Sequence, residues 1–185
     1  SIKVLSPNGN ENWKVGTNQL VTWTSTEVSN VETFYSLNNG DSWTSIGTVP
    51  GINGSIPWSI DNDSQVSNSA LIRVEDTSNP TIVNDTSNGT FGVIAVFDIT
   101  RPESGHYIVA EEPAYINWTK KGTHTGENNV TLEYSTDEGG NWTYVVGVDH
   151  KVPNTGSYYW SSVPANVLSH YCKIRLTDVY NVNAT

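Results

Sequence analysis

The feature that most constrains this fold is a short turn motif that occurs twice. The motif reads S-x-(D/N)-x-G-x-x-W, and a tyrosine and a run of alternating apolar and polar residues precede each copy. Asp and Asn side chains accept hydrogen bonds from the backbone a few residues downstream, and glycine adopts the positive φ of a tight turn without a steric penalty. The pattern predicts a β-hairpin in each half of the chain. Its defining positions are Ser36, Asn38, Gly40 and Trp43 in the first copy and Ser135, Asp137, Gly139 and Trp142 in the second.

The segments around the two hairpins also align, which predicts a duplicated domain. Val21 and Trp23 in the first copy correspond to Ile116 and Trp118 in the second, and strand alternation places both side chains of each pair on one face. Short strands about ten residues apart, with turn residues between them and no helical periodicity, are typical of an immunoglobulin-like β-sandwich. Besides the strand that leaves each hairpin, strands are expected near residues 2–7, 19–25, 31–35, 54–58, 70–76 and 90–94 of the first copy and 97–102, 115–119, 130–134, 156–160 and 172–178 of the second.

The predicted fold class is therefore all-β, with two tandem immunoglobulin-like β-sandwiches of about seven strands each. The first sandwich is expected to span residues 1–95 and the second residues 96–185. The second copy has no counterpart of the strand at 90–94, so it is expected to lack its last strand. Because a missing edge strand leaves unpaired backbone groups, we expect sequence beyond residue 185, or a partner chain, to supply it. The absence of methionine and of a leader segment also favours a piece of a longer protein.

The aromatic residues and the single cysteine give specific packing expectations. Tyr35 and Tyr134 are expected to be buried at equivalent places in the two sandwiches. Cys172 aligns with Ala70, so it is expected to be a buried and unreactive thiol. Equal spacing in the two copies predicts core positions for three tryptophan pairs, which are Trp23 and Trp118, Trp43 and Trp142, and Trp58 and Trp160.

Charge and hydropathy exclude two classes of partner. Nine Lys and Arg residues stand against 19 Asp and Glu residues, which gives a net charge of -10. Such a surface repels a phosphate backbone, so nucleic acid is not expected as a partner. No apolar run approaches the ~18 residues that a membrane helix needs, so membrane insertion is not expected either. One cysteine permits no internal disulfide, which argues against a small disulfide-stabilised domain.

The combined pattern resembles a known group of surface modules. It reads V-x-S-P-N-G, W-x-V-G, V-T-W-T, Y-S-x-(D/N)-x-G-x-x-W, G-S-x-x-W and I-R-V-x-D in order along the first copy, and much of it recurs in the second. This pattern is similar to tandem immunoglobulin-like repeats of large secreted and cell-surface proteins of prokaryotes, including surface-layer proteins. The opening half is also similar to the N-terminal domain of fungal Kre9/Knh1-like Ser/Thr-rich GPI-anchored wall proteins. The resemblance implies an extracellular structural or interaction module, in a surface-layer (S-layer) or cell-wall-associated protein, whose partners are neighbouring repeats or copies of the same protein.

The candidate site residues are few. Asp61 and Asp63 form a D-x-D run in a loop and are weak calcium candidates; no other cofactor is expected. The four histidines lie in the second copy without metal-ligand spacing, and we interpret them as solvated loop residues. The chain contains Asn-x-Ser/Thr sequons, which are consistent with a secreted glycoprotein, although the composition alone would produce about half of them. The sequons are at Asn53, Asn62, Asn84, Asn88, Asn117, Asn129, Asn141 and Asn183.

Other functions remain as alternatives. The hairpin alone resembles the Asp-box of sialidases, but each copy lies in a repeat that is not a four-stranded propeller blade, and no catalytic signature is present. We therefore predict a protein that is not an enzyme. The alternatives are an adhesin-like or carbohydrate-binding module and a non-catalytic spacer of a secreted hydrolase. The tyrosines without strict counterparts are the candidates for a glycan-binding surface, namely Tyr107, Tyr144, Tyr158 and Tyr159.

Overall fold

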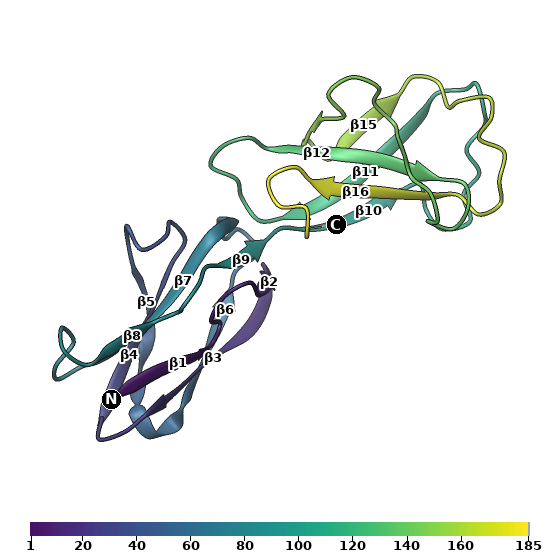
Figure 1. The fold of residues 1–185 in the computed structure, drawn as a ribbon. Coiled ribbons are helices and arrows are strands. Elements are labelled where there is room, and N and C mark those ends of the chain that lie inside the picture. Colours follow the sequence, from purple (N-terminus) through teal and green to yellow (C-terminus); the bar gives the residue numbers. More distant parts are fainter. Residues whose placement is uncertain (185) are drawn as a thin grey trace. The chain divides into compact units, whose positions relative to one another are not determined.

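A computed structural model describes residues 1–184, and the last residue of the second predicted sandwich, residue 185, lies outside the described residues. Strands account for 49% of the chain and helix for 2%, so the fold is all-β, as the sequence predicts. The chain forms two compact units, Ser1–Ile94 and Ala95–Thr185 (Figure 1). Each unit is an immunoglobulin-like β-sandwich built from two sheets.

In the first unit, the last strand of the chain segment, β9, is part of the larger of the two sheets. One sheet has the order β1-β3-β6, and the other has the order β2-β9-β7-β4-β5, with β8 paired to β7. Strand β9 pairs antiparallel with β7 and parallel with β2, so it has a neighbour on both edges. The short strands β2 and β8 were not predicted. The bounds are β1 Ile2–Ser6, β2 Asn12–Lys14, β3 Thr17–Ser25, β4 Asn30–Ser36, β5 Thr44–Pro50, a 3₁₀ turn Gly51–Asn53, β6 Ser55–Ile60, β7 Ser67–Asp76, β8 Asn84–Thr86 and β9 Phe91–Ile94.

The second unit repeats part of this order, without counterparts of β2, β8 and β9 among residues 95–184. One sheet has the order β10-β11-β15; in the other, β12 pairs with β13, β14 and β16. Strands β13 and β14 together take the place of β5. Among residues 95–184, no strand lies beside β16 on the edge away from β12, so the second sandwich lacks its last strand, as predicted. The bounds are β10 Val96–Arg101, β11 Ala114–Lys121, β12 Asn129–Ser135, β13 Thr143–Tyr144, β14 Val152–Pro153, β15 Ser157–Trp160 and β16 Lys173–Asp178.

The two cores are built at equivalent positions. Trp23 and Trp118 are 2% and 4% exposed, which confirms their equivalence. Tyr35 and Tyr134 are half-buried, so the prediction of full burial is wrong for both. A tyrosine packs its ring while its hydroxyl stays in contact with water. The rings still occupy matching places, against Trp58 at 4.6 Å and against Trp160 at 5.3 Å between ring centroids. The second core comprises Ile116, Trp118, Val130, Leu132, Val152, Trp160, Val163 and Leu176.

The hairpin tryptophans are not core residues, which corrects the prediction from spacing. Trp43 and Trp142 are half-buried. Their rings cover arginine side chains of β7 and β16, with Arg73 4.7 Å from the Trp43 centroid and Arg175 4.2 Å from the Trp142 centroid. Arg73 pairs with Phe34, whose side chain lies on the face opposite the buried Thr33. The tryptophans therefore stabilise the outer face of the sheet through cation–π contacts.

Cys172 is exposed, so the prediction of a buried thiol is wrong. The alignment with Ala70 holds, because Leu71 pairs with Ser36 and Lys173 pairs with the equivalent Ser135, so Ala70 and Cys172 precede matching residues. Ala70 is fully buried because Phe91 of β9 pairs with it across the sheet. The described part of the second unit has no strand at that edge, so the thiol of Cys172 remains accessible.

Candidate functional site

The hairpin motif uses its polar side chains within the turn. In the second copy the Ser135 hydroxyl accepts the Gly139 amide proton at 2.8 Å and donates to the Asp137 carboxylate at 2.7 Å. The Asn141 backbone amide and side-chain amide both donate to Asp137, at 2.8 and 2.7 Å. These Asn141 hydrogen bonds, and then the one from Ser135, lower the pKa of Asp137 from 3.8 to about 2. A carboxylate saturated in this way holds the turn and leaves little capacity for a ligand.

The first copy forms the same network with an amide in place of the carboxylate. The Ser36 hydroxyl accepts the Gly40 amide proton at 2.9 Å, and the Asn38 side-chain oxygen accepts the Ser42 amide proton at 3.0 Å. Each hairpin is also anchored by a serine that the sequence pattern did not reveal, at the start of β7 in the first copy and just before β16 in the second. Ser67 donates to the Leu37 carbonyl, at 2.7 Å. In the second copy Ser169 donates to the Thr136 carbonyl at 2.6 Å. Each serine lies three residues before the aligned pair Ala70 and Cys172, and this matching place is the signal that could have identified it.

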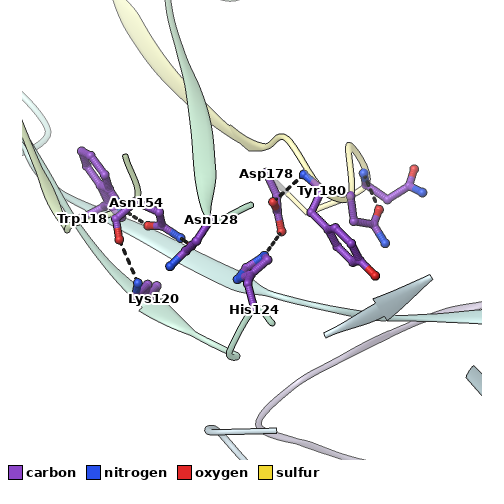
Figure 2. A network of polar contacts seen from close by, with 9 residues as sticks. Trp118, Lys120, His124, Asn128, Asn154, Asp178 and Tyr180 are labelled. Carbon is purple, nitrogen blue, oxygen red and sulfur yellow. Dashed lines mark hydrogen bonds and ion pairs between the residues drawn. The ribbon is translucent and has the colours of Figure 1, made fainter. Parts of the chain in front are cut away.

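A buried histidine–aspartate pair is the main polar feature that the sequence did not reveal. The side chains of His124 and Asp178 are 2% and 1% exposed, and His124 Nε2 lies 2.8 Å from Asp178 Oδ2 (Figure 2). The interpretation of His124 as a solvated loop histidine is therefore wrong. The other carboxylate oxygen of Asp178 accepts the Tyr180 amide proton at 2.9 Å. Asp76, at the equivalent place, accepts the Ser78 amide proton in the same way, so turn capping is the role that the two copies share.

A second polar cluster holds the loop beside β14. Trp118 Nε1 donates to the Asn154 side-chain oxygen at 2.8 Å, and the Asn154 amide nitrogen donates to the Asn128 side-chain oxygen at 2.9 Å. Lys120 Nζ donates to the Asn154 carbonyl oxygen at 2.8 Å. Figure 2 marks this hydrogen bond. In the first unit the corresponding indole, Trp23, donates to the Gly51 carbonyl at 3.2 Å. Both clusters satisfy buried polar groups of the fold.

The predicted calcium candidates lie apart from other ligands. Asp61 and Asp63 are exposed, and the Asp61 carbonyl accepts the Ser64 amide proton at 3.1 Å in a turn. No group of three His, Cys, Asp or Glu residues within residues 1–184 is arranged to hold a metal ion. Calcium binding at this turn stays a prediction.

Most sequon asparagines lie on the surface. Asn117 and Asn129 are half-buried. Of the exposed ones, Asn141 and Asn84 donate their side-chain amides within the protein, to Asp137 and to the Pro80 carbonyl. Glycosylation of any of them stays a prediction. The exposed sequon residues are Asn53, Asn62, Asn84, Asn88, Asn141 and Asn183.

The second unit contains a cavity of about 600 Å³ at its open edge. Its apolar wall includes Tyr134 and Trp160 from the two sheets and Ile174 from β16. Ile108, from the segment between β10 and β11, and Cys172 also line the cavity. We call this cavity the edge slot. The first unit offers a direct comparison, because Phe91 of β9 lies beside Ala70 and Trp58 there, the residues aligned with Cys172 and Trp160.

Two exposed aromatic rings form a further surface feature. Tyr115 and Tyr159 pair across strands β11 and β15, are each 51% exposed, and have ring centroids 5.1 Å apart. Of the tyrosines proposed for the surface, Tyr107 and Tyr144 are also exposed, whereas Tyr158 is half-buried. Tyr144 stacks on His150 at 3.8 Å between centroids.

Comparison with known proteins gives similarity to solved structures only. No family model matches the chain, and no curated protein matches it. Among solved structures, fibronectin(III)-like modules of CbhA from Clostridium thermocellum are 16% identical with a TM-score of 0.34, over 97% of this chain and 86% of that chain. The N-terminal four Ig domains of Dscam1 isoform 1.9 are 13% identical with a TM-score of 0.36, over 88% and 38%. The Dpr11 IG1 and DIP-gamma IG+IG2 structure is 11% identical with a TM-score of 0.33, over 96% and 97%.

The strand order defines the class of the protein. The chain is a pair of immunoglobulin-like modules. In residues 1–184 no helix is long and apolar enough to span a membrane.

Proposed function

We propose that this chain is a non-catalytic structural and interaction module of an exported cell-surface protein, of the surface-layer or cell-wall-associated repeat type. The observation that carries the proposal is what the two copies share. The residues that recur at matching places are the ones that build the sandwich: the turn network, the tryptophan over an arginine, and the aspartate that caps the turn after β7 or β16. The two copies therefore share the residues that hold the fold together, and a repeat protein depends on such residues because each repeat has to fold in the same way.

Charge and surface chemistry support the same proposal. A net charge of -10 keeps a protein soluble outside the cell and excludes nucleic acid as a partner on electrostatic grounds. Exposed sequon asparagines are accessible to a glycosylation system where the source organism has one. The partners proposed are neighbouring repeats or further copies of the same protein.

Immunolabelling of intact source cells tests the proposal. An antibody raised against residues 1–185 is expected to label the outer surface of unpermeabilised cells and to decorate isolated cell-wall fragments. Labelling that appears only after permeabilisation would contradict an exported function. Electron microscopy of the labelled fragments would then show whether the label follows an ordered lattice, as the surface-layer version requires.

A carbohydrate-binding module is the second candidate, and the tyrosine pair favours it. Adjacent exposed rings can stack on a sugar face, and Tyr115 and Tyr159 present two rings side by side. Affinity electrophoresis in gels that contain wall polysaccharide distinguishes the two functions. Retardation of the native chain that is lost in Tyr115→Ala and Tyr159→Ala, but retained in the control Tyr107→Ala, would favour carbohydrate binding over a purely structural function.

A further inference from the structure

One sequon of the second unit lies beside the exposed tyrosine pair. Tyr115, Asn117 and Thr119 are alternate residues of β11, and the residues between them, Ile116 and Trp118, are buried. Because side chains alternate along a strand, the sequon asparagine, the sequon threonine and the tyrosine share the outer face of the sheet. The sequon and an aromatic ring therefore stand in one row on the surface of this unit.

Strand β15 completes the surface around this asparagine. Tyr159 pairs with Tyr115 and Ser157 pairs with Asn117, so Tyr159 is the diagonal neighbour of Asn117. Diagonal neighbours lie about 7–8 Å apart, within reach of aromatic and long side chains. Ser157 Oγ donates to Asn117 Oδ1 at 2.8 Å, which fixes the side-chain amide. A group attached to this amide lies beside two rings whose centroids are 5.1 Å apart.

The amide nitrogen of Asn117 is available for attachment. Its side-chain oxygen accepts from Ser157, and its Nδ2 makes no hydrogen bond within residues 1–184. By contrast, the sequon residues Asn84, Asn129 and Asn141 donate this nitrogen to acceptors in the protein. Asn117 is also the only sequon residue in the sequence that has an aromatic residue two positions before it. A free attachment nitrogen and a neighbouring ring are therefore combined at this sequon.

The first unit provides an internal comparison. Its strand β3 has Thr22 at the place of Asn117, so it carries no sequon there. It also has no tyrosine pair, because Leu20 and Pro57 pair at the equivalent place. The tyrosines and the asparagine thus occur together in one copy and are both absent from the other. Since the first sandwich forms without the rings, a role that involves the asparagine explains them better than a role in the fold.

We propose that Asn117 is an N-glycosylation site whose first sugar packs on the rings of Tyr115 and Tyr159. Its Nδ2 forms a bond to the anomeric carbon of a polyprenyl-pyrophosphate-linked oligosaccharide. The bond from that carbon to the pyrophosphate oxygen breaks, the polyprenyl pyrophosphate leaves with the electron pair, and Nδ2 releases one proton. The C–H groups on one face of the sugar then contact the ring faces, while its hydroxyl groups stay in water.

A covalently attached sugar fits these rings better than a free polysaccharide does. Attachment at Asn117 holds the sugar next to the rings at a high effective concentration, whereas a free ligand loses its translational freedom on binding. The proposal rests on the exported function proposed above, because sequons of this kind are modified in secreted chains.

Secretion of the full chain by a eukaryotic host that modifies sequons tests the site. Mass spectrometry of the peptide that contains Asn117 is expected to find sugar on this residue, and Asn117→Gln should remove it. After the glycan is trimmed to its first sugars, the tyrosine rings should shift the proton signals of these sugars upfield in NMR spectra. Tyr115→Ala should abolish the upfield shift without lowering the fraction of Asn117 that carries sugar.

The contact should also slow amide hydrogen exchange in β11. Relative to the same chain produced without glycosylation, residues 114–121 should exchange about fivefold more slowly, the effect of one ring contact, and Tyr115→Ala should remove the difference. Thr22→Asn provides the matched control, because it makes the same Asn-Trp-Thr sequon in the first unit beside Leu20 and Pro57. The sugar that Thr22→Asn carries should show no upfield shift.

Four results would overturn the proposal. The first is an unmodified Asn117 in the secreted chain, and the second is a shift and an exchange effect that persist in Tyr115→Ala. The third is an equal shift for the sugar that Thr22→Asn carries, since the tyrosines would then contribute nothing. The fourth is retardation of the unmodified chain by free wall polysaccharide with no upfield shift in the modified chain, which would assign the rings to a free ligand.

Failure of this proposal is distinct from failure of the proposed function. If intact source cells are labelled on their surface but their native chain carries no sugar on Asn117, only the glycosylation proposal is overturned. Labelling that appears only after permeabilisation contradicts the exported function itself and, with it, the native modification.

Discussion

Truncation of Trp118 should destabilise the second unit far more than truncation of Trp142, although both tryptophans belong to the repeated pattern. Trp118 is 4% exposed, and its indole N–H donates to the buried side chain of Asn154. Replacing a buried tryptophan by alanine costs about 3–5 kcal/mol through lost burial and the cavity that remains. The Asn154 oxygen also loses its donor, which adds about 1 kcal/mol. The expected loss for Trp118→Ala is therefore about 5 kcal/mol, a large part of the stability of a small domain.

Trp142 lies half-buried over Arg175, and its contact is a cation–π interaction on the outer face of the sheet. Trp142→Ala should cost only about 1–2 kcal/mol. Trp118→Phe keeps most of the ring and removes the N–H, so it should cost about 1–2 kcal/mol and separates the hydrogen bond from the packing.

The assay is urea unfolding of the full chain, followed by hydrogen exchange and mass spectrometry of segments from each unit, because two units need not unfold in one transition. The free energy of unfolding of the second unit should fall most for Trp118→Ala and much less for Trp142→Ala and Trp118→Phe. The free energy of unfolding of the first unit should not change. Equal losses for Trp118→Ala and Trp142→Ala would refute the assignment of one tryptophan to the core and the other to the outer face.

Three further predictions follow from the turn and the buried pair. Gly139→Ala should destabilise the second unit by about 1–3 kcal/mol, since Gly139 has a φ of 98° and an added Cβ would lie 3.2 Å from the Trp142 ring; thermal unfolding measures this. The lowered pKa of Asp137 means that its stabilisation is present above pH 3.8 and is lost as the pH falls toward 2; Asp137→Asn should flatten the dependence of stability on pH in that range. Asp178→Ala should cost more than Asp76→Ala in urea unfolding, because only Asp178 also pairs with a buried histidine.

The repeated pattern predicted most of the fold because it is a local and periodic signal. Alternation identified the inward residues of β3 and β11, and the turn motif located both hairpins. The short strands β2 and β8 were missed because they have three residues each, too few for alternation to be visible. The missing last strand was correctly predicted because the first copy provided an internal reference.

The errors concern contacts that the pattern does not specify. The side of the sheet that Trp43 covers depends on the register of β4 and β5, and the irregularity between Thr33 and Phe34 shifts that register by a residue. The pair of His124 and Asp178 joins positions 54 residues apart, and no local spacing indicates it. Cys172 was expected to be buried by analogy with Ala70, but the strand that buries Ala70 has no counterpart in the described second unit.

The central claim is that the two units share one fold and differ at one edge, and amide hydrogen exchange at Ile72 and Ile174 tests it most directly. The Ile72 amide donates to Ser87 on the β9 side of β7, at 3.1 Å, and Ile174 is its counterpart on β16. In the full chain under native conditions, the Ile72 amide should exchange at least 100-fold more slowly than the Ile174 amide, because exchange at an unpaired edge needs no unfolding. Equal protection of the two amides would contradict the claim, since it would mean that the edge of β16 is already covered.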